Sequence, residues 1–280
     1  MPVPSAALDV ADRDARARAR AAGVEIRKLT PDEAPDACSL LADVWDSDPR
    51  HGPMEASLLI ALLHCDNYVS GAFDHGRMVG VCVGFFAAPI GTGMHSHIAG
   101  VIRQYAGRGV GTALKLHQRA WALHRGVTSI SWTYDPLVAR NAFFNLHLLG
   151  ARVTQYVPDF YGEMSDGIND GQATDRLVVH WAIVSSTLNT AASVPLDARE
   201  FVVLEMDQAR EPVLASGPPP DGFTRCRVAI PDDIALFRTR DRGVAARWRL
   251  AAREALVALL ADRWVVTDFD RSGYYRLERN

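Results

Sequence analysis

Apolar and polar residues alternate in some stretches of the chain and recur at helical spacing in others. The first pattern predicts half-buried strands, and the second predicts helices with one face toward a core. The strands predicted in this way are residues 24–29, 68–73, 78–88, 94–102, 127–134, 151–156, 176–184, 201–206, 223–230, 264–270 and 274–278. The predicted helices are residues 9–22, 30–45, 54–64, 110–126, 135–149 and 244–260.

Three short motifs mark where some of these elements begin or turn. Thr30-Pro31-Asp32-Glu33 matches a capping box, in which Thr and Glu side chains satisfy amides at a helix start. Asp74-His75-Gly76-Arg77 joins two apolar runs and is typical of a tight hairpin turn. Asp135-Pro136 predicts a helix start with Asp135 as the N-cap, because Asp accepts amide hydrogen bonds and Pro lacks an N–H group.

The order of these elements predicts an α+β fold in two parts. After the first helix, residues 24–184 give the order βαα, then a run of strands, then αβαββ. Residues 185–200 mix Ser, Thr, Asn, Ala and Pro, which is typical of a linker. We therefore predict a larger domain at residues 1–184, a linker at 185–200 and a smaller α+β unit at 201–280.

Composition narrows the class of protein. Of the 280 residues, 48% are hydrophobic and 22% are charged, which is ordinary for a globular enzyme, and the formal net charge is -3. Basic residues gather in the segment 13–20, which favours a solvated helix face over a nucleic-acid surface. The apolar run 78–90 is too short to cross a bilayer, and residues 1–10 lack a secretory signal. We therefore expect a cytoplasmic protein that binds neither nucleic acid nor membrane.

The cysteines are widely scattered along the chain. They are Cys38, Cys65, Cys82 and Cys226, and no two form a Cys-x-x-Cys pair. This spacing argues against a zinc site and against a disulfide framework. We expect reduced thiols and no bound metal.

A glycine-rich stretch, residues 104–112, joins a predicted strand to a predicted helix and contains Gly107, Gly109 and Gly111. Glycines let the backbone approach a ligand closely, and the helix that begins near Val110 offers unpaired amides and a positive dipole end. The spacing matches neither a Walker A loop nor the Gly-x-Gly-x-x-Gly motif. We interpret the stretch as a phosphate-binding loop, and a plain turn followed by a helix start is the alternative.

The order of elements over residues 24–184, with the glycine loop after the fourth strand, resembles the GNAT superfamily of CoA-dependent N-acyltransferases. The family's loop pattern, Gln/Arg-x-x-Gly-x-Gly/Ala, falls on residues 106–111, where Ala106 departs at the first position. Within the superfamily, several strings look similar to a bacterial subgroup of predicted acyltransferases, some of them linked to N-succinylation of amino acids. These strings are Asp135-Pro136-Leu137, Arg140-Asn141-Ala142, Asn145-Leu146 and Phe160-Tyr161-Gly162.

The resemblance implies a mixed, mostly antiparallel sheet flanked by helices, and acetyl-CoA or another acyl-CoA as co-substrate. The residues that it implies for binding this co-substrate are Val101, Ile102, Ala106, Gly107, Arg108, Gly109, Val110, Gly111, Thr112, Asn141 and Asn145. The loop amides would hold the pyrophosphate, with added charge from Arg108, and the end of the fourth strand would hold the thioester carbonyl. Asn141 and Asn145 would hold the pantetheine amides, or alternatively would bridge nearby backbone.

Catalysis in such a site needs a base for the amine and an acid for the departing thiolate. His97 is a candidate base because the pKa of a histidine lies near working pH, and a structural hydrogen bond beside His95 is the alternative. The Tyr that serves as the acid in many family members falls here on Leu146. The candidate replacements are Tyr161, Tyr134 and Tyr156. Tyr161 is favoured because it is predicted in a loop, although packing is an alternative role for each.

Two functions follow from these observations. The first is an N-acyltransferase that moves an acetyl or succinyl group to a small-molecule amine such as an amino acid, with Arg140, Arg152 or Arg103 as clamps for a carboxylate. The second is a catalytically silent GNAT-like module that binds CoA or a metabolite and acts through residues 201–280. That segment has three alternative roles, which are completing the substrate pocket, forming a homodimer interface or covering a sheet edge.

Overall fold

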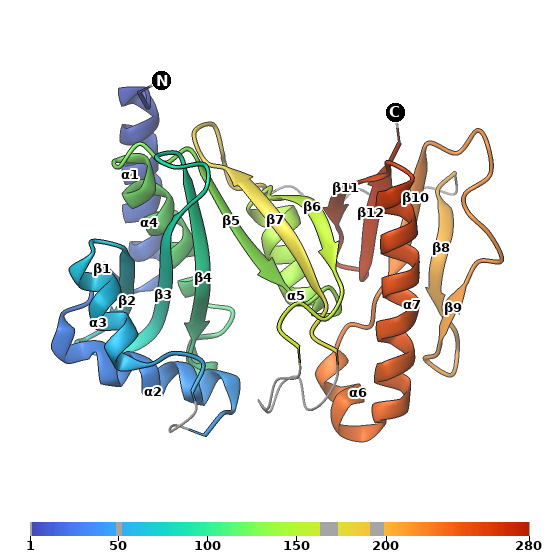
Figure 1. Cartoon of the computed structure of the whole chain (residues 1–280), viewed down its shortest axis with the longest axis horizontal. Coiled ribbons are helices and arrows are strands. Elements are labelled where there is room, and N and C mark those ends of the chain that lie inside the picture. The colour runs from blue at the N-terminus through green and yellow to red at the C-terminus, as the bar shows by residue number, and fades with distance from the viewer. Residues whose placement is uncertain (1, 49–51, 163–172, 191–198, 280) are drawn as a thin grey trace. The chain divides into compact units, whose positions relative to one another are not determined.

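The computed structural model describes residues 2–48, 52–162, 173–190 and 199–279, which divide into two compact units (Figure 1). The first unit consists mainly of Met1–Trp132 with Ala182–Ser185. The second consists mainly of Thr133–Met164, Asn169–Trp181 and Ser186–Asn280. The domain limits at 184 and 201 stay a prediction, and residues 191–198 of the expected linker lie outside the described part of the chain.

The first unit contains every element predicted up to residue 134, each within a few residues of its expected place. Its helices are α1 (Ser5–Ala22), η1 (Pro31–Glu33), α2 (Ala34–Trp45), α3 (Ala56–His64), η3 (Arg103–Tyr105) and α4 (Val110–Leu123). Its strands are β1 (Glu25–Lys28), β2 (Tyr68–Asp74), β3 (Arg77–Ala87), β4 (Gly93–Val101) and most of β5 (Ser129–Tyr134). The capping box at Thr30 and Glu33 is confirmed.

The strands of this unit follow the order β1-β2-β3-β4-β5. Pairing is antiparallel from β1 to β4 and parallel between β4 and β5, as expected for a mixed, mostly antiparallel sheet. The predicted hairpin between β2 and β3 is confirmed. His75 and Gly76 both have positive φ, 47° and 82°, the geometry of the turn type that suits the twist of paired strands.

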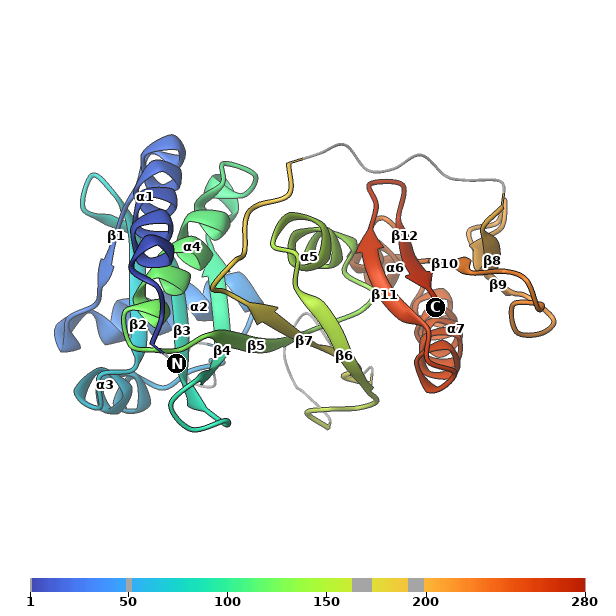
Figure 2. The same cartoon turned by 90° about the horizontal axis from the view of Figure 1, so that it is seen from above.

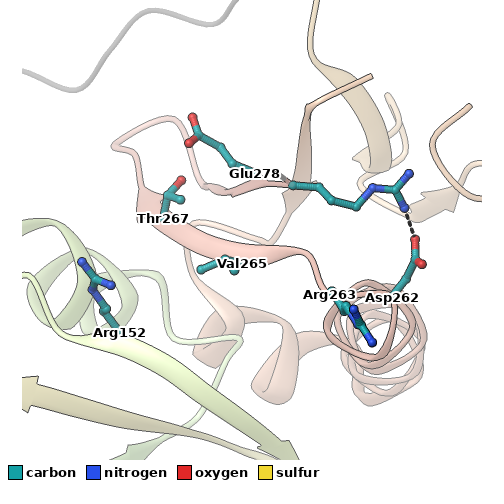
Figure 3. Close-up of a pocket in the computed structure, with 7 residues that line it drawn as sticks. Arg152, Asp262, Arg263, Val265, Thr267 and Glu278 are labelled. Carbon is teal, nitrogen blue, oxygen red and sulfur yellow. Dashed lines mark hydrogen bonds and ion pairs between the residues drawn. The ribbon is translucent and has the colours of Figure 1, made fainter. Parts of the chain in front are cut away.

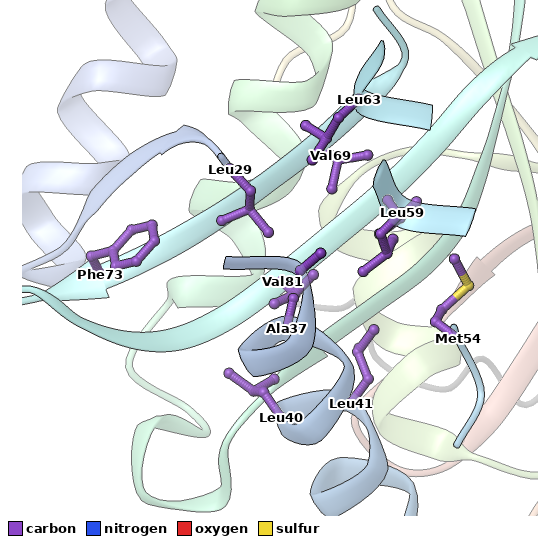
Figure 4. Packing of buried hydrophobic residues seen from close by; sticks show 12 residues of the cluster. Leu29, Ala37, Leu40, Leu41, Met54, Leu59, Leu63, Val69, Phe73 and Val81 are labelled. Atoms are coloured by element: carbon purple, nitrogen blue, oxygen red, sulfur yellow. The ribbon is translucent and has the colours of Figure 1, made fainter. Parts of the chain in front are cut away.

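Helices cover both faces of this sheet, because side chains on a strand alternate between its faces. Val81 and Val83 on β3 belong to a hydrophobic cluster with α2 and α3 (Figure 4). On the opposite face, a side chain at Gly80 would lie only 3.2 Å from Leu114 on α4. Figure 2 shows α1 and α4 on one side of β2, β3 and β4 and α3 on the other.

Helix α1 is fastened to the outer side of α4 by polar contacts. The buried Arg119 guanidinium on α4 lies 3.4 Å from the Asp14 carboxylate on α1. His124, just after α4, lies 3.1 Å from Asp12. The two helices therefore form one layer in which α1 is held in a defined register along α4.

The second unit contains a sheet in the order β11-β12-β10-β8-β9, with α7 packed against it. Its helices are α5 (Ala139–Ala142), the π-helical η4 (Phe143–Leu148), α6 (Ile234–Arg240) and α7 (Arg242–Ala261). Its strands are β6 (Arg152–Val157), β7 (Arg176–Ala182), β8 (Phe201–Met206), β9 (Pro212–Leu214), β10 (Arg225–Ala229), β11 (Val265–Phe269) and β12 (Tyr274–Glu278). The sequence did not predict α6 or β9. None of the described helices combines the length and apolar character that a bilayer crossing requires.

The prediction that Asp135 caps a helix was wrong, whereas the predicted end of that helix near Leu149 is confirmed. The helix begins at Ala139 with Val138 as its N-cap, and from Phe143 it continues as a π-helical turn. The Asp135 carboxylate accepts a hydrogen bond from the Leu137 N–H at 2.9 Å, so it forms a local turn ahead of the helix.

Asp135 is instead the centre of a buried ionic cluster with arginines from far along the chain. Its carboxylate accepts two hydrogen bonds from Arg249 on α7, both at 2.7 Å, and one from Arg238 on α6 at 2.6 Å. All three side chains are buried. Burial by itself would raise the pKa of Asp135, but the charges of Arg249 and Arg238 outweigh it and hold the pKa well below its ordinary value.

Breaking this cluster should destabilise the second unit strongly. We expect Arg249→Met to lower the free energy of unfolding by about 3–5 kcal/mol, because a buried carboxylate loses its bidentate partner. Arg247→Gln is the matched control on the same helix, since Arg247 pairs with Glu211 at the surface and should contribute no more than about 1 kcal/mol. Urea unfolding measures both, and equal small losses would contradict this account.

A second buried charge lies in the first unit, where Lys115 of α4 meets the sheet. Its Nζ donates to Ser96 Oγ on β4 at 2.8 Å and to Gln118 Oε1 at 3.2 Å, and lies 3.8 Å from the centre of the Trp132 ring. The side chain is almost completely buried. This burial lowers the pKa of Lys115 to about 8 from its ordinary value of 10.5.

The lowered pKa predicts how stability depends on pH. Between pH 8 and 10.5 the unfolded chain keeps a proton on Lys115 that the folded chain releases, so stability rises with pH across this window. The gain amounts to about 3 kcal/mol. Urea unfolding at pH 7 and pH 10 should show that Lys115→Met lacks this gain, whereas Lys28→Met, which changes an exposed lysine of β1, keeps it. Parallel pH profiles for all three proteins would refute the assignment.

Candidate acyl-CoA site

The glycine loop after β4 leaves a row of backbone amides without acceptors. Gly107 and Gly109 adopt positive φ, 77° and 87°, which glycine tolerates at little cost. The first hydrogen bond of α4 runs from the Ala113 N–H to the Gly109 carbonyl at 3.0 Å, and no side chain caps the helix. Within the described residues, five amides therefore have no acceptor, namely those of Gly107, Gly109, Val110, Gly111 and Thr112.

This row of amides is suited to bind an anion. Unpaired N–H groups at a helix N-terminus, together with the helix dipole, favour phosphate oxygens. No atom lies within 4 Å of where a side chain would start at Gly107 or Gly111, so the backbone can approach a ligand. Ala106, at the position where the family pattern departs, donates its own N–H to the Arg103 carbonyl at 3.1 Å.

Arg108 is fixed against a neighbouring ring within this loop. Its guanidinium carbon lies 4.4 Å from the centre of the Tyr105 ring. The Tyr105 hydroxyl in turn donates to Asp74 at 2.5 Å, and this hydrogen bond lowers the pKa of Asp74. Arg108 therefore contributes charge from a position that Tyr105 determines.

The loop lies at the end of a strand that loses its neighbour. The register between β4 and β5 stops at His95 and Ser131, although β4 continues to Val101. The Ile102 N–H donates to the Val79 carbonyl at 3.0 Å, so alternation directs the Val101 N–H away from β3, toward the unpaired edge. Of the two predicted residues, Val101 thus offers a free edge amide and Ile102 does not.

His97 occupies an irregular position in β4. Val83 pairs with Ile98 and Gly84 pairs with Ser96, so His97 is the extra residue of a β-bulge. The His97 ring lies 6.1 Å from the His95 ring and 5.8 Å from the Phe85 ring. Bulges commonly re-aim a side chain at a functional site.

The two histidines are biased toward their neutral forms. Burial lowers the pKa of His97. For His95, burial and the nearby charges of His97 and Lys115 lower the pKa to about 4. A neutral imidazole can accept a proton, so the electrostatics of this face suit a base.

The candidate acid and amide-binding residues lie in the second unit. Tyr161 is 42% exposed, its N–H donates to Thr174 Oγ1 at 2.9 Å, and its hydroxyl lies 3.4 Å from Thr133 Oγ1. Asn141 on α5 is half-buried, whereas Asn145 in η4 is buried. The π-helical turn that carries Asn145 is a feature often found at functional sites.

The other two tyrosines are held in the protein interior. Burial raises the pKa of Tyr134. Burial and a hydrogen bond to Asp175 raise the pKa of Tyr156, whose hydroxyl donates to that carboxylate at 2.5 Å. Asp175 is also paired with Arg253 at 2.6 Å, so Tyr156 belongs to an ionic cluster. Tyr161 is the candidate with an accessible hydroxyl.

A pocket of about 580 Å³ also lies in the second unit (Figure 3). Arg152 on β6, one of the predicted carboxylate clamps, faces it together with Val265 and Thr267 on β11. Arg279 is engaged by Asp262 at 2.5 Å. Among the described residues, no group of three or more His, Cys, Asp or Glu side chains is arranged to hold a metal ion.

Several residues that shape the two units were not singled out in the sequence. Arg238, Arg249 and Arg253 lie in helices that carry many arginines, and no local pattern distinguishes them. The bulge at His97 has no sequence signature either, because it depends on the pairing with β3.

Comparison with known protein families gives a match over less than half of the chain. Residues 35–148 match the Acetyltransferase (GNAT) family. Among curated proteins, none matches the chain. Among solved structures, the ribosomal-protein-S18-alanine N-acetyltransferase from Escherichia coli is 15% identical and has a TM-score of 0.46; the match covers 62% of this chain and 99% of that one.

Two further solved structures have the same level of similarity. The IAA acetyltransferase from Bacillus cereus ATCC 14579 is 18% identical with a TM-score of 0.44, covering 56% of this chain and 98% of that one. A GNAT family acetyltransferase from Elizabethkingia anophelis, with acetyl-CoA bound, is 14% identical with a TM-score of 0.44, covering 57% and 98%. At these values the solved structures carry no argument about the substrate.

The family match and the geometry agree. The matched residues include the whole glycine loop, its free amides and the strand that loses its neighbour. Residues 35–148 therefore match an acetyltransferase of the GNAT family in sequence, with a loop geometry that agrees, and the chain is a transferase of acyl groups from acyl-CoA.

Proposed function

We propose that this enzyme transfers an acetyl or succinyl group from acyl-CoA to the amine of a small metabolite such as an amino acid. The observation that carries the proposal is the row of five amides without acceptors in the glycine loop and first turn of α4, together with the unpaired edge of β4 that precedes them in the chain. The first feature suits the diphosphate of CoA, and the second offers the Val101 N–H to the thioester carbonyl. The cytoplasmic location and the bacterial subgroup stay predictions from the sequence.

The reaction is a direct transfer within a ternary complex. The amine nitrogen attacks the thioester carbon, the Val101 N–H stabilises the oxyanion, and the C–S bond then breaks. We assign the proton from the amine to His97, which burial keeps neutral, and the proton for the departing thiolate to Tyr161. Asn141 and Asn145 would position the pantetheine arm.

Release of free thiol tests this proposal most directly. Acetyl-CoA and succinyl-CoA are each incubated with a panel of D- and L-amino acids, and the CoA thiol is followed colorimetrically. We expect turnover with at least one pair. Tight CoA binding without turnover on any amine would favour the catalytically silent module, for which the buried Leu146 at the expected acid position is the structural argument.

Gly111 provides a matched pair of variants for the same assay. Gly111→Asp places a carboxylate in the first turn of α4, which suits the helix but repels a diphosphate. Gly111→Asn adds nearly the same volume without the charge. We expect Gly111→Asp to weaken CoA binding at least tenfold more than Gly111→Asn while both remain folded. Equal CoA binding by the two variants would refute the proposal that this loop binds the diphosphate.

The pH dependence of the rate tests His97. Its pKa is lowered, so the active neutral form should persist below pH 6.5, and the rate should fall as pH drops through the pKa of the folded enzyme. We expect His97→Gln to lower kcat about 100-fold. The remaining rate of this variant should fall at acid pH only as far as protonation of the amine substrate requires, because the imidazole is gone. The control variant His95→Gln should keep the full fall in rate at acid pH. An unchanged acidic limb in His97→Gln would exclude His97 as the base.

A further inference from the structure

Arg18 on α1 lies directly against the glycine loop. A side-chain carbon built on Gly109 would lie 2.9 Å from Arg18 Nη2, 3.1 Å from Cζ and 3.2 Å from Nε. The guanidinium therefore occupies the space beside Gly109, which is the N-cap residue of α4. Helix α1 lies outside residues 35–148, so the family match assigns this arginine no role.

The Arg18 side chain is half-buried, and its Nε is buried without a hydrogen-bond partner among the residues that the structure describes. Neighbouring arginines differ, since Arg16 on the same helix lies 3.9 Å from Asp12 and Arg119 on α4 is bonded to the Ile183 carbonyl. A buried donor without an acceptor is costly, and proteins normally provide one.

The position of this charge is also unfavourable by itself. The N-terminus of a helix is the positive end of its dipole, so a cation placed there is repelled. Here Arg18 lies beside Gly109, and five unpaired amides, which are also donors, lie within the same loop and first turn of α4. An anion with several oxygens would satisfy such donors, and a guanidinium binds phosphate oxygens in a bidentate fork.

From this geometry we infer that Arg18 binds the diphosphate of acyl-CoA, so that a helix preceding the acetyltransferase domain completes its donor site. The inference rests on the proposed function. In this arrangement α1 has a binding role in addition to packing. Its contacts through Asp14 and Asp12 fix its position along α4 and thereby hold Arg18 beside Gly109.

The test compares ligands with and without phosphate. Calorimetry gives the Kd of CoA for the full-length wild type, Arg18→Gln, Arg18→Lys and the control Arg13→Gln, which changes an exposed arginine of α1. We expect Arg18→Gln to weaken CoA binding at least tenfold, Arg18→Lys to weaken it less, and Arg13→Gln to leave it unchanged. The KM for S-acetylpantetheine, which has no phosphate, should be the same in all four proteins.

The outcomes separate this inference from the proposed function. If wild type does not bind CoA, the proposed function fails. If wild type binds CoA and Arg18→Gln binds it equally well, only the role of Arg18 fails. A rise in the KM for S-acetylpantetheine in Arg18→Gln would show a structural role and would also overturn the inference.

Inorganic phosphate and pyrophosphate, titrated alone, identify the source of the anion. If Arg18 serves CoA, both should bind at least a hundredfold more weakly than CoA. Binding of inorganic phosphate as tight as that of CoA would make the site one for free phosphate instead.

Discussion

The first N–H groups of an α-helix cannot be satisfied within the helix, and at α4 this constraint is left unresolved. Ser, Thr, Asp and Asn are the preferred caps that can supply an acceptor, as Asp241 does for α7, but α4 has Gly109 at that position and no side-chain acceptor. Stability is given up locally, and an anion that supplies oxygens to these amides recovers it. The glycines and the course of the loop leave this set of donors unpaired, and Arg18 adds a further donor beside them.

Strand β4 carries three further features of the candidate site. Its edge amide at Val101 is released because pairing with β5 stops at His95, and its bulge places His97 beside Phe85. On the opposite face, Ser96 accepts from the buried Lys115, which ties β4 to the helix that begins at the glycine loop. One strand thus positions the Val101 amide at its edge, His97 on one face and the contact between Ser96 and Lys115 on the other.

Apart from α6 and β9, the local elements followed from the sequence because they depend on nearby residues. The hairpin at His75-Gly76 and the capping box at Thr30 each satisfy backbone groups within four residues. The helix at Asp135 was mispredicted for the opposite reason. That carboxylate looked like a cap, but its partners Arg238 and Arg249 lie 103 and 114 positions away in the chain. Charge pairing in a buried site outweighed the local preference.

The sequence by itself indicated the kind of domain and the kind of ligand, because the order of its elements and its glycine loop resemble the GNAT superfamily, and glycines permit the positive φ angles that such a loop requires. It also offered His97 as a candidate base, and this role stays a prediction. Only the tertiary structure decided which amides lack acceptors, which residue forms the bulge and which arginine reaches the loop. These depend on pairing between strands and on the packing of α1 against α4, and such contacts join residues whose separation along the chain carries no pattern.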